Sequence, residues 1–180
     1  MGGGNDAIQM LVNLSHNLLG TFVSLAFTLG GFFAVIGAVT YLASNASASR
    51  KAPGQSQSGG KVIAVLLLCG GLAGLDQMIG AAARQFGWQG ATFDAISYVD
   101  VGTFGVAADA ANAVLSLVRM LGVFFALQGM LAWKRSLKDG HSGLTASQDV
   151  SSGTLKFVLG VFCVCSPYLL SALQKSLGML

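Results

Sequence analysis

The stretch "LGGFFAVIGAVTY" (residues 29–41) returns 92 residues later as "LGVFFALQGMLAW" (residues 121–133). The two copies share Leu, Gly, Phe-Phe, Ala and a second Gly in register, and both end on an aromatic ring. Neither copy carries a charge, and neither alternates polar with apolar residues as a half-buried strand does. The pattern therefore predicts two related apolar helices.

The whole chain is poor in charge. Only 9% of its 180 residues are charged and 53% are apolar, whereas a typical soluble domain is about one quarter charged. No Asp, Glu, Lys or Arg occurs from Ala7 to Ser49. Uncharged apolar runs of this length predict a membrane protein. The net charge of +3 comes from scattered residues, and no cluster of basic and aromatic residues indicates a nucleic-acid reader.

Four apolar segments are predicted to cross the membrane, at about 18–43, 62–83, 110–133 and 155–173. Each is long enough, as a helix, for a hydrocarbon core about 30 Å thick. Helices satisfy their own backbone hydrogen bonds, which lipid cannot do. We expect an all-α fold, namely a four-helix transmembrane protein built from two parallel-repeat helical hairpins.

The charged residues predict the orientation of these helices. Basic residues gather in the loops at 45–61 and 134–154, whereas the connection 84–109 holds one Arg and three Asp. The positive-inside rule places both basic loops in the cytoplasm, and both termini and the central connection on the outer side of the membrane.

The two loops also end alike, with "SGGK" at 58–61 and "SGTLK" at 152–156. We therefore expect three parts. Residues 1–87 form the first hairpin with an N-terminal helix extension, 88–109 an interfacial connection, and 110–180 the second hairpin. The alternative is that apolar helices share Leu, Gly, Phe and Ala by composition alone.

Two charges, Asp76 and Arg119, fall inside predicted spans. Each lies a similar distance from the outer end of its helix, so antiparallel packing would let them meet. A charge in the membrane centre costs about 2.5–3.5 kcal/mol on insertion scales, and pairing offsets that cost. A structural ion pair is the simpler interpretation; an ion or proton relay, or a contact between subunits, is the functional one.

Small residues spaced four apart on three predicted spans indicate close helix packing, within one chain and between copies. These residues are Gly30, Ala34, Ala38, Gly70, Gly74, Gly122 and Ala126. The three cysteines are expected to be small buried residues without a disulfide. Pro167 is expected to kink the fourth span.

No phosphate loop, nucleophile elbow, zinc-ligand spacing or paired-carboxylate motif occurs in the sequence, so catalytic and metal sites are not expected. We expect a non-enzymatic structural protein with no cofactor other than bound phospholipid. The residues predicted to face lipid headgroups or a lumen are Arg50, Lys51, Lys61, Lys134, Arg135 and Lys138.

The "MGGGND" start and the layout of the chain resemble the small polytopic proteins of IncI-type conjugation and type IVB secretion, the TraQ/TraR and IcmC/IcmD group. The chain also looks like a duplicated form of the two-helix conjugative pilin, whose hairpin assembles with phospholipid into a hollow tube. The resemblance implies a structural subunit of a conjugation or type IV secretion apparatus, in a pilus or an inner-membrane assembly. Its implied partners are further copies of itself, phospholipid and other components of the apparatus, with transient passage of DNA and no sequence-specific binding.

Two other functional classes remain open at this point. One is a small ion- or proton-coupled transporter or channel that uses Asp76 and Arg119, and the other is a holin-like protein. A transporter is expected to form a small defined oligomer with measurable flux, whereas a secretion subunit is expected in large assemblies.

Overall fold

The computed structural model describes residues 3–51, 59–88, 91, 107–137 and 143–176. All regular secondary structure in these residues is helical, which confirms the all-α prediction. The helices are α1 (Gly3–Lys51), α2 (Gly59–Ala73), α3 (Leu75–Gln85), α5 (Ala107–Ser136), α6 (Gly143–Val164) and α7 (Ser166–Ser176).

Two helices are long and apolar enough to cross a membrane alone, over Gln9–Ala48 in α1 and Ala108–Ser136 in α5. The pairs α2–α3 and α6–α7 each qualify only when both members are taken together, and the two members are bent relative to each other by 93° and 59°. The described residues thus contain two to four candidate spans, which fits a membrane protein.

The two bends have different local causes. Pro167 is the second residue of α7 and has no backbone N–H, so the helix ladder cannot continue unchanged through this point. The predicted kink of the fourth span is therefore confirmed. The first bend occurs at Gly74, between α2 and α3. Gly74 had been predicted to serve helix packing. Glycine lacks a side chain that would hold the backbone in helical geometry.

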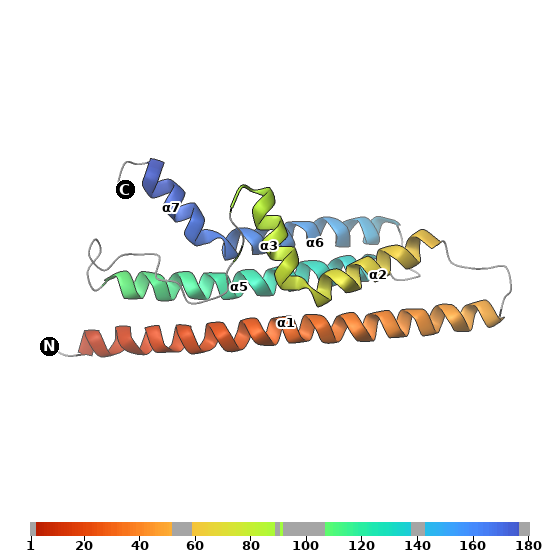
Figure 1. The fold of residues 1–180 in the computed structure, drawn as a ribbon, viewed down its shortest axis with the longest axis horizontal. Helices are drawn as coiled ribbons and strands as arrows, with labels where there is room; N and C mark the ends of the chain where they lie inside the picture. Colours follow the sequence, from red (N-terminus) through yellow and green to blue (C-terminus); the bar gives the residue numbers. More distant parts are fainter. Residues whose placement is uncertain (1–2, 52–58, 89–90, 92–106, 138–142, 177–180) are drawn as a thin grey trace.

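Figure 1 shows α1 and α5 extending side by side in the same direction, with α2 and α6 returning antiparallel to them. The most extensive helix packing is between α5 and α6, followed by α1 against α5 and α1 against α2. The ends of α1 and α5, and the starts of α2 and α6, all lie toward the same end of the molecule (Figure 1).

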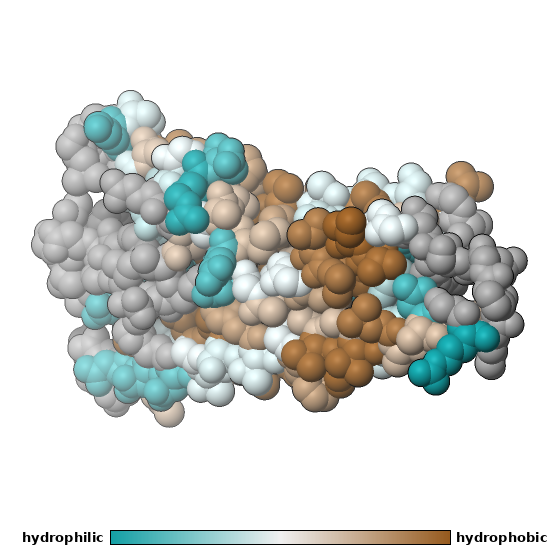
Figure 2. All heavy atoms as spheres, turned by 45° about the vertical axis from the view of Figure 1, so that its right-hand side comes forward, coloured by the Kyte–Doolittle hydropathy of each residue, from teal (hydrophilic) through white to brown (hydrophobic). Residues whose placement is uncertain are grey.

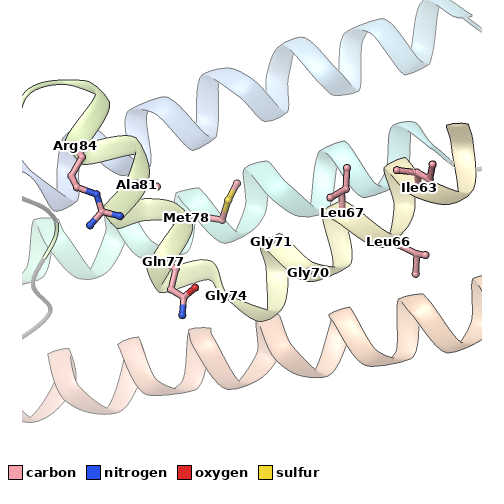
Figure 3. A pocket seen from close by; sticks show the side chains of 10 residues that line it. All are labelled: Ile63, Leu66, Leu67, Gly70, Gly71, Gly74, Gln77, Met78, Ala81 and Arg84. Carbon is pink, nitrogen blue, oxygen red and sulfur yellow. The ribbon is translucent and has the colours of Figure 1, made fainter.

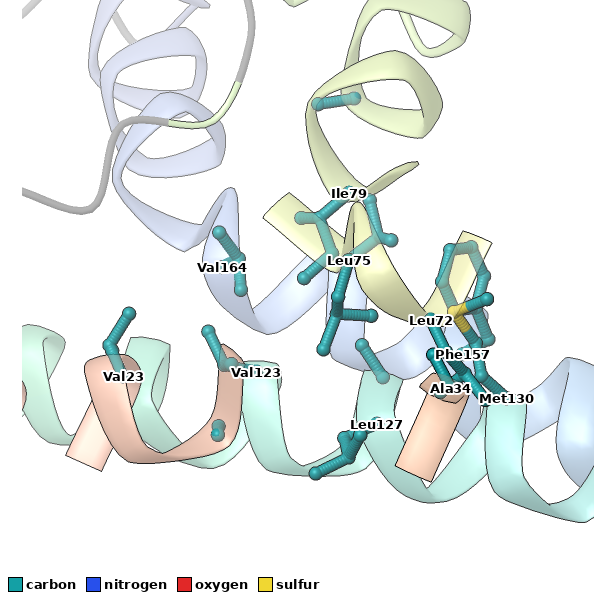
Figure 4. Packing of buried hydrophobic residues seen from close by; sticks show 14 of the residues in the cluster. Val23, Ala34, Leu72, Leu75, Ile79, Val123, Leu127, Met130, Phe157 and Val164 are labelled. Atoms are coloured by element: carbon teal, nitrogen blue, oxygen red, sulfur yellow. The ribbon is translucent and has the colours of Figure 1, made fainter. Parts of the chain in front are cut away.

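The core forms where the α2–α3 bend lies over α5 and α6 (Figure 4). Leu72, Leu75 and Ile79 point inward from the bend and are at most 1% exposed. They meet side chains of α5 and α6 that include Val123 and Val164. The bend thus brings apolar side chains from the end of α2 and the start of α3 into the same part of the core. In a straight helix these side chains would be distributed along the helix.

One face of α1 is buried and its remaining surface is not. The buried stripe follows the helical period of three to four residues, and its members are Ser15, Leu19, Val23, Ala26, Gly30, Ala34 and Gly37. Away from this stripe Phe32, Val35 and Val39 are about 60% exposed, at 58%, 63% and 60%. Figure 2 shows hydrophobic side chains gathered on one part of the surface, with hydrophilic side chains on either side along the long axis.

The predicted loops are shorter than expected. Helix α1 continues to Lys51, and α6 begins at Gly143, so the "SGTLK" segment is helical and not the end of a loop. A tertiary contact holds this early part of α6: Trp133 Nε1 donates hydrogen bonds to the Val150 carbonyl at 3.3 Å and to Thr154 Oγ1 at 3.2 Å. Most of the predicted interfacial connection, 88–109, lies outside the described residues.

Candidate functional site

The described basic residues that were expected to face lipid share one end of the molecule. Arg50 lies in the last turn of α1, Lys61 in the first turn of α2, and Lys134 and Arg135 in the last turn of α5 (Figure 1). Arg50 and Arg135 are exposed, whereas Lys61 and Lys134 are half-buried. The Lys51 side chain and Lys138 lie outside the described residues. Contact of these residues with lipid stays a prediction.

A cleft of about 530 Å³ opens at this end between α1, α2 and α5. We call it the basic cleft. Its apolar wall consists of Phe33, Ile36, Val65, Leu68, Leu131 and Leu137. Its polar side chains are Thr40, Tyr41, Ser44, Lys134 and Arg135. This combination of an apolar wall with two cations and three hydroxyls suits an amphiphile better than a wholly apolar ligand.

Lys134 reaches across the basic cleft from α5 to α1. Its Nζ donates a hydrogen bond of 2.8 Å to the backbone carbonyl of Phe33. Gly37 makes this reach possible, because a Cβ atom at that position would collide with the Lys134 ammonium group. Helix packing had been expected at neighbouring small residues and not at Gly37. The sequence signal that could have identified Gly37 was its position in the repeated motif, where it aligns with Gly129.

The basic cleft is electropositive. No Asp or Glu is among the described residues that line it, and the Phe33 carbonyl is neutral, so it does not neutralise the Lys134 ammonium. A lysine side chain combines an apolar stem with a charged head, so Lys134 suits a cleft that has both an apolar wall and polar groups. The arrangement can attract and hold an anion beside an apolar surface.

A second hollow, of about 670 Å³, lies on the open side of the α2–α3 bend (Figure 3). Its lining is mainly apolar or small, including Ile63, Leu67 and Met78, and Gln77 and Arg84 are its only strongly polar side chains. Nothing in this lining forms a nucleophile–base or metal-ligand set. The lining of this hollow is suited to contact with hydrocarbon.

Asp76 and Arg119 differ in environment. Asp76 is exposed in the first turn of α3, whereas Arg119 on α5 is only 2% exposed. The Arg119 charge lies near Cys165, at the α6–α7 bend, and its Nε atom is buried without a hydrogen-bond partner, although the side chain interacts elsewhere. The structure does not bring the two side chains into one buried environment. Their pairing, within or between chains, stays a prediction.

Most of the predicted packing residues do lie between helices. Gly30, Ala34, Gly122 and Ala126 are buried, and Ala38 is half-buried against the core. Gly70 is exposed with no neighbour that a Cβ would meet, and Gly74 lies at the bend. Among the described residues, neither Gly70 nor Gly74 packs closely against another helix.

The closest helix packing involves glycines that were not singled out. Gly153 and Gly160, seven residues apart on α6, face α5. A Cβ at Gly160 would lie 2.6 Å from the Gly122 carbonyl oxygen and from the Ala126 nitrogen, and one at Gly129 would lie 2.6 Å from the Gly153 carbonyl oxygen. The seven-residue spacing of glycines on both helices was the available signal, because residues two turns apart share a face.

Among the described residues, no group of three or more His, Cys, Asp or Glu side chains could hold a metal ion, and Cys69, Cys163 and Cys165 are free thiols. In comparisons with protein families, curated proteins and solved structures, nothing matches this chain. The basic cleft is accordingly the candidate site that the geometry itself supplies.

Proposed function

We propose that the chain is a non-enzymatic structural subunit of a bacterial conjugation or type IV secretion apparatus. In this proposal it assembles with phospholipid and further copies of itself, as a pilus or as an inner-membrane complex. The resemblance in sequence is the reason for proposing a conjugation or secretion apparatus. The exposed apolar surface of α1 is the reason for proposing that copies of the chain assemble.

The surface of α1 carries the proposal. Phe32, Val35 and Val39 are about 60% exposed along a helix whose other face is already packed. A contiguous apolar surface of this kind indicates contact with lipid or with another protein. In a bilayer the lipid chains already cover such a helix, so association depends on close packing. Gly31 lies on this helix with no neighbour within 4 Å, which leaves room for another helix to approach.

The proposed topology has four membrane-crossing segments, two of them bent, with both termini in the periplasm. The position of the basic residues at one end of the molecule supports this topology, because the positive-inside rule predicts that a basic end lies in the cytoplasm. The termini would then lie on the opposite side.

The proposed repeat consists of two copies of one hairpin, each a long helix followed by a bent return helix. The common direction of α1 and α5 supports it (Figure 1). Further support comes from contacts with the first motif copy: Leu127 of the second copy lies 3.6 Å from the position of a Cβ at Gly30. Lys134, the residue after the second copy, contacts the site of Gly37.

Deletion of the gene in its bacterial host, combined with microscopy of the purified protein, tests the proposal. We expect deletion to abolish conjugative or secretory transfer, and a plasmid copy to restore it. Negative-stain images should contain filaments, rings or other large assemblies. As a matched variant, Asp76→Asn should support transfer normally, because its side chain is exposed and no catalytic role is assigned to it.

Two outcomes would contradict the proposal. One is normal transfer in the deletion strain. The other is a population of small uniform particles that conduct ions in liposomes and lose that flux in the Asp76→Asn variant, which would favour a transporter.

A further inference from the structure

We infer that the basic cleft is a binding site for one anionic phospholipid, with the phosphodiester at Lys134 and Arg135 and an acyl chain along the apolar wall. This inference rests on the proposed membrane role and deepens it. It assigns the lipid to a cleft within a single chain, formed jointly by the two halves, and it specifies the charge of the lipid.

The charge in the cleft supports an anionic ligand. The Lys134 ammonium has three N–H donors, of which one is used by the Phe33 carbonyl. No other described group accepts a hydrogen bond from it, and no described acid lines the cleft. Arg135, exposed on the next position of α5, adds a second cation with a forked set of donors. A phosphodiester supplies acceptor oxygens for both residues.

The hydroxyl groups beside these cations suit the same headgroup. Thr40 Oγ1 donates to the Ile36 carbonyl at 2.7 Å, so its proton is used and its lone pairs remain available as acceptors. Tyr41 and Ser44 place further hydroxyls in the lining, from the next turn of α1. A headgroup that combines a phosphate with hydroxyls, such as that of phosphatidylglycerol, matches acceptors and donors of this kind.

The apolar wall indicates a lipid and not a free phosphate ion. Phe33 and Ile36 from α1 line the cleft together with Val65 and Leu68 from α2. Inorganic phosphate would leave this surface uncovered, whereas an acyl chain covers it. Helix α1 continues thirteen residues past Gly37 to Arg50, about 20 Å at 1.5 Å per residue, so the cations lie beside apolar helix and not at its tip.

Native mass spectrometry of the full chain in detergent, titrated with phosphatidylglycerol or phosphatidylcholine, tests the site. We expect one tightly held phosphatidylglycerol per chain and much weaker binding of the zwitterionic lipid. The double variant Lys134→Gln/Arg135→Gln should bind phosphatidylglycerol about 30-fold more weakly, from the usual contribution of two basic residues near a membrane. The matched control Arg50→Gln/Lys156→Gln removes the same charge outside the cleft and should bind normally.

Gly37→Ala provides a second variant that changes no charge. Its added methyl displaces only the flexible end of Lys134, so the fold should be retained while phosphatidylglycerol binding falls about fivefold. Equal loss in the cleft variant and its control would overturn the inference, as would equal binding of both lipids or saturation by inorganic phosphate alone. Because these measurements use purified protein, their failure leaves the transfer assay, and hence the proposed function, to be judged separately.

Discussion

At the scale of single residues, the glycines between α5 and α6 decide how closely these helices approach. The site of a Cβ at Gly160 is within 2.6 Å of backbone atoms on α5, which cannot rotate away as a side chain can. Any larger residue must therefore push the helices apart. In lipid, van der Waals packing replaces the hydrophobic effect between helices. This loss of contact therefore lowers the stability of the helix pair directly.

Gly160→Ala is expected to lower the free energy of unfolding by about 1–3 kcal/mol, the usual cost of overpacking. Gly20→Ala on α1 is the matched control, because its Cβ would meet nothing within 4 Å and it lies away from the surface proposed for assembly. Alanine there should leave stability unchanged or raise it by up to about 1 kcal/mol through helix propensity. Denaturant unfolding in detergent measures both, and similar losses in the two variants would contradict the close contact.

Arg119 and Asp76 are expected to respond differently to substitution. Arg119→Gln changes a buried, interacting side chain and should lower the free energy of unfolding by about 1.5–3 kcal/mol, the usual worth of hydrogen bonds to a charged group. Asp76→Asn alters an exposed side chain and should change it by about 0.5 kcal/mol or less. A double-mutant cycle tests independence: large, non-additive losses in both single variants would instead support the ion pair.

At the scale of helices, the bends at Gly74 and near Pro167 shape the two return segments. The 93° bend lays α3 across the bundle and brings Ile79 into the core with Leu72. At its far end, Phe86 and Trp88 pack on Phe162 of α6, with ring centroids 5.0 and 5.6 Å from the latter. An aromatic cluster of this kind suits the interface between membrane and water. The bend therefore joins the end of α3 to α6 through these aromatic rings.

Cysteine labelling tests the orientation of these helices. In a background with the three native cysteines changed to alanine, Ser47→Cys and Leu144→Cys should react with reagents on the cytoplasmic side. Gln85→Cys, at the exposed last residue of α3, should react from the periplasm. All three positions are exposed, so access through the protein does not limit labelling. Reaction of Ser47→Cys and Gln85→Cys from the same side would overturn the topology.

At the scale of the whole molecule, the proposed assembly would involve both the apolar face of α1 and the basic end. Copies that associate through α1 would bring their basic ends together, and this repulsion needs counter-charge. Anionic headgroups supply about 1 kcal/mol for each basic residue near the surface. Assembly and lipid binding are therefore expected to be coupled.

Native mass spectrometry before and after delipidation measures this coupling. We expect homo-oligomers that carry lipid, and their dissociation when lipid is removed or when salt screens the headgroups. Adding phosphatidylglycerol back should restore the oligomer, whereas phosphatidylcholine serves as the control lipid. A lipid-free monomer that still supports transfer in cells would contradict the coupling.

The sequence by itself determined the features that depend on composition and spacing along one helix. Lack of charge and long apolar runs predicted helices fit for a membrane, Pro167 predicted a kink, and the basic residues predicted one charged end. These follow from local chemistry, because hydropathy, proline geometry and formal charge do not depend on which helices are neighbours.

Only the tertiary structure decided which small residues pack and where charges meet other groups. Gly70 and Gly71 look equivalent in the sequence, yet only Gly71 faces the Met130 side chain. The bend at Gly74, the reach of Lys134 over Gly37 and the different burial of Asp76 and Arg119 likewise depend on which helix faces which. The rotation and depth of each helix are set by packing against helices that are distant in the sequence. The residue pattern of one helix does not specify which of those helices it packs against.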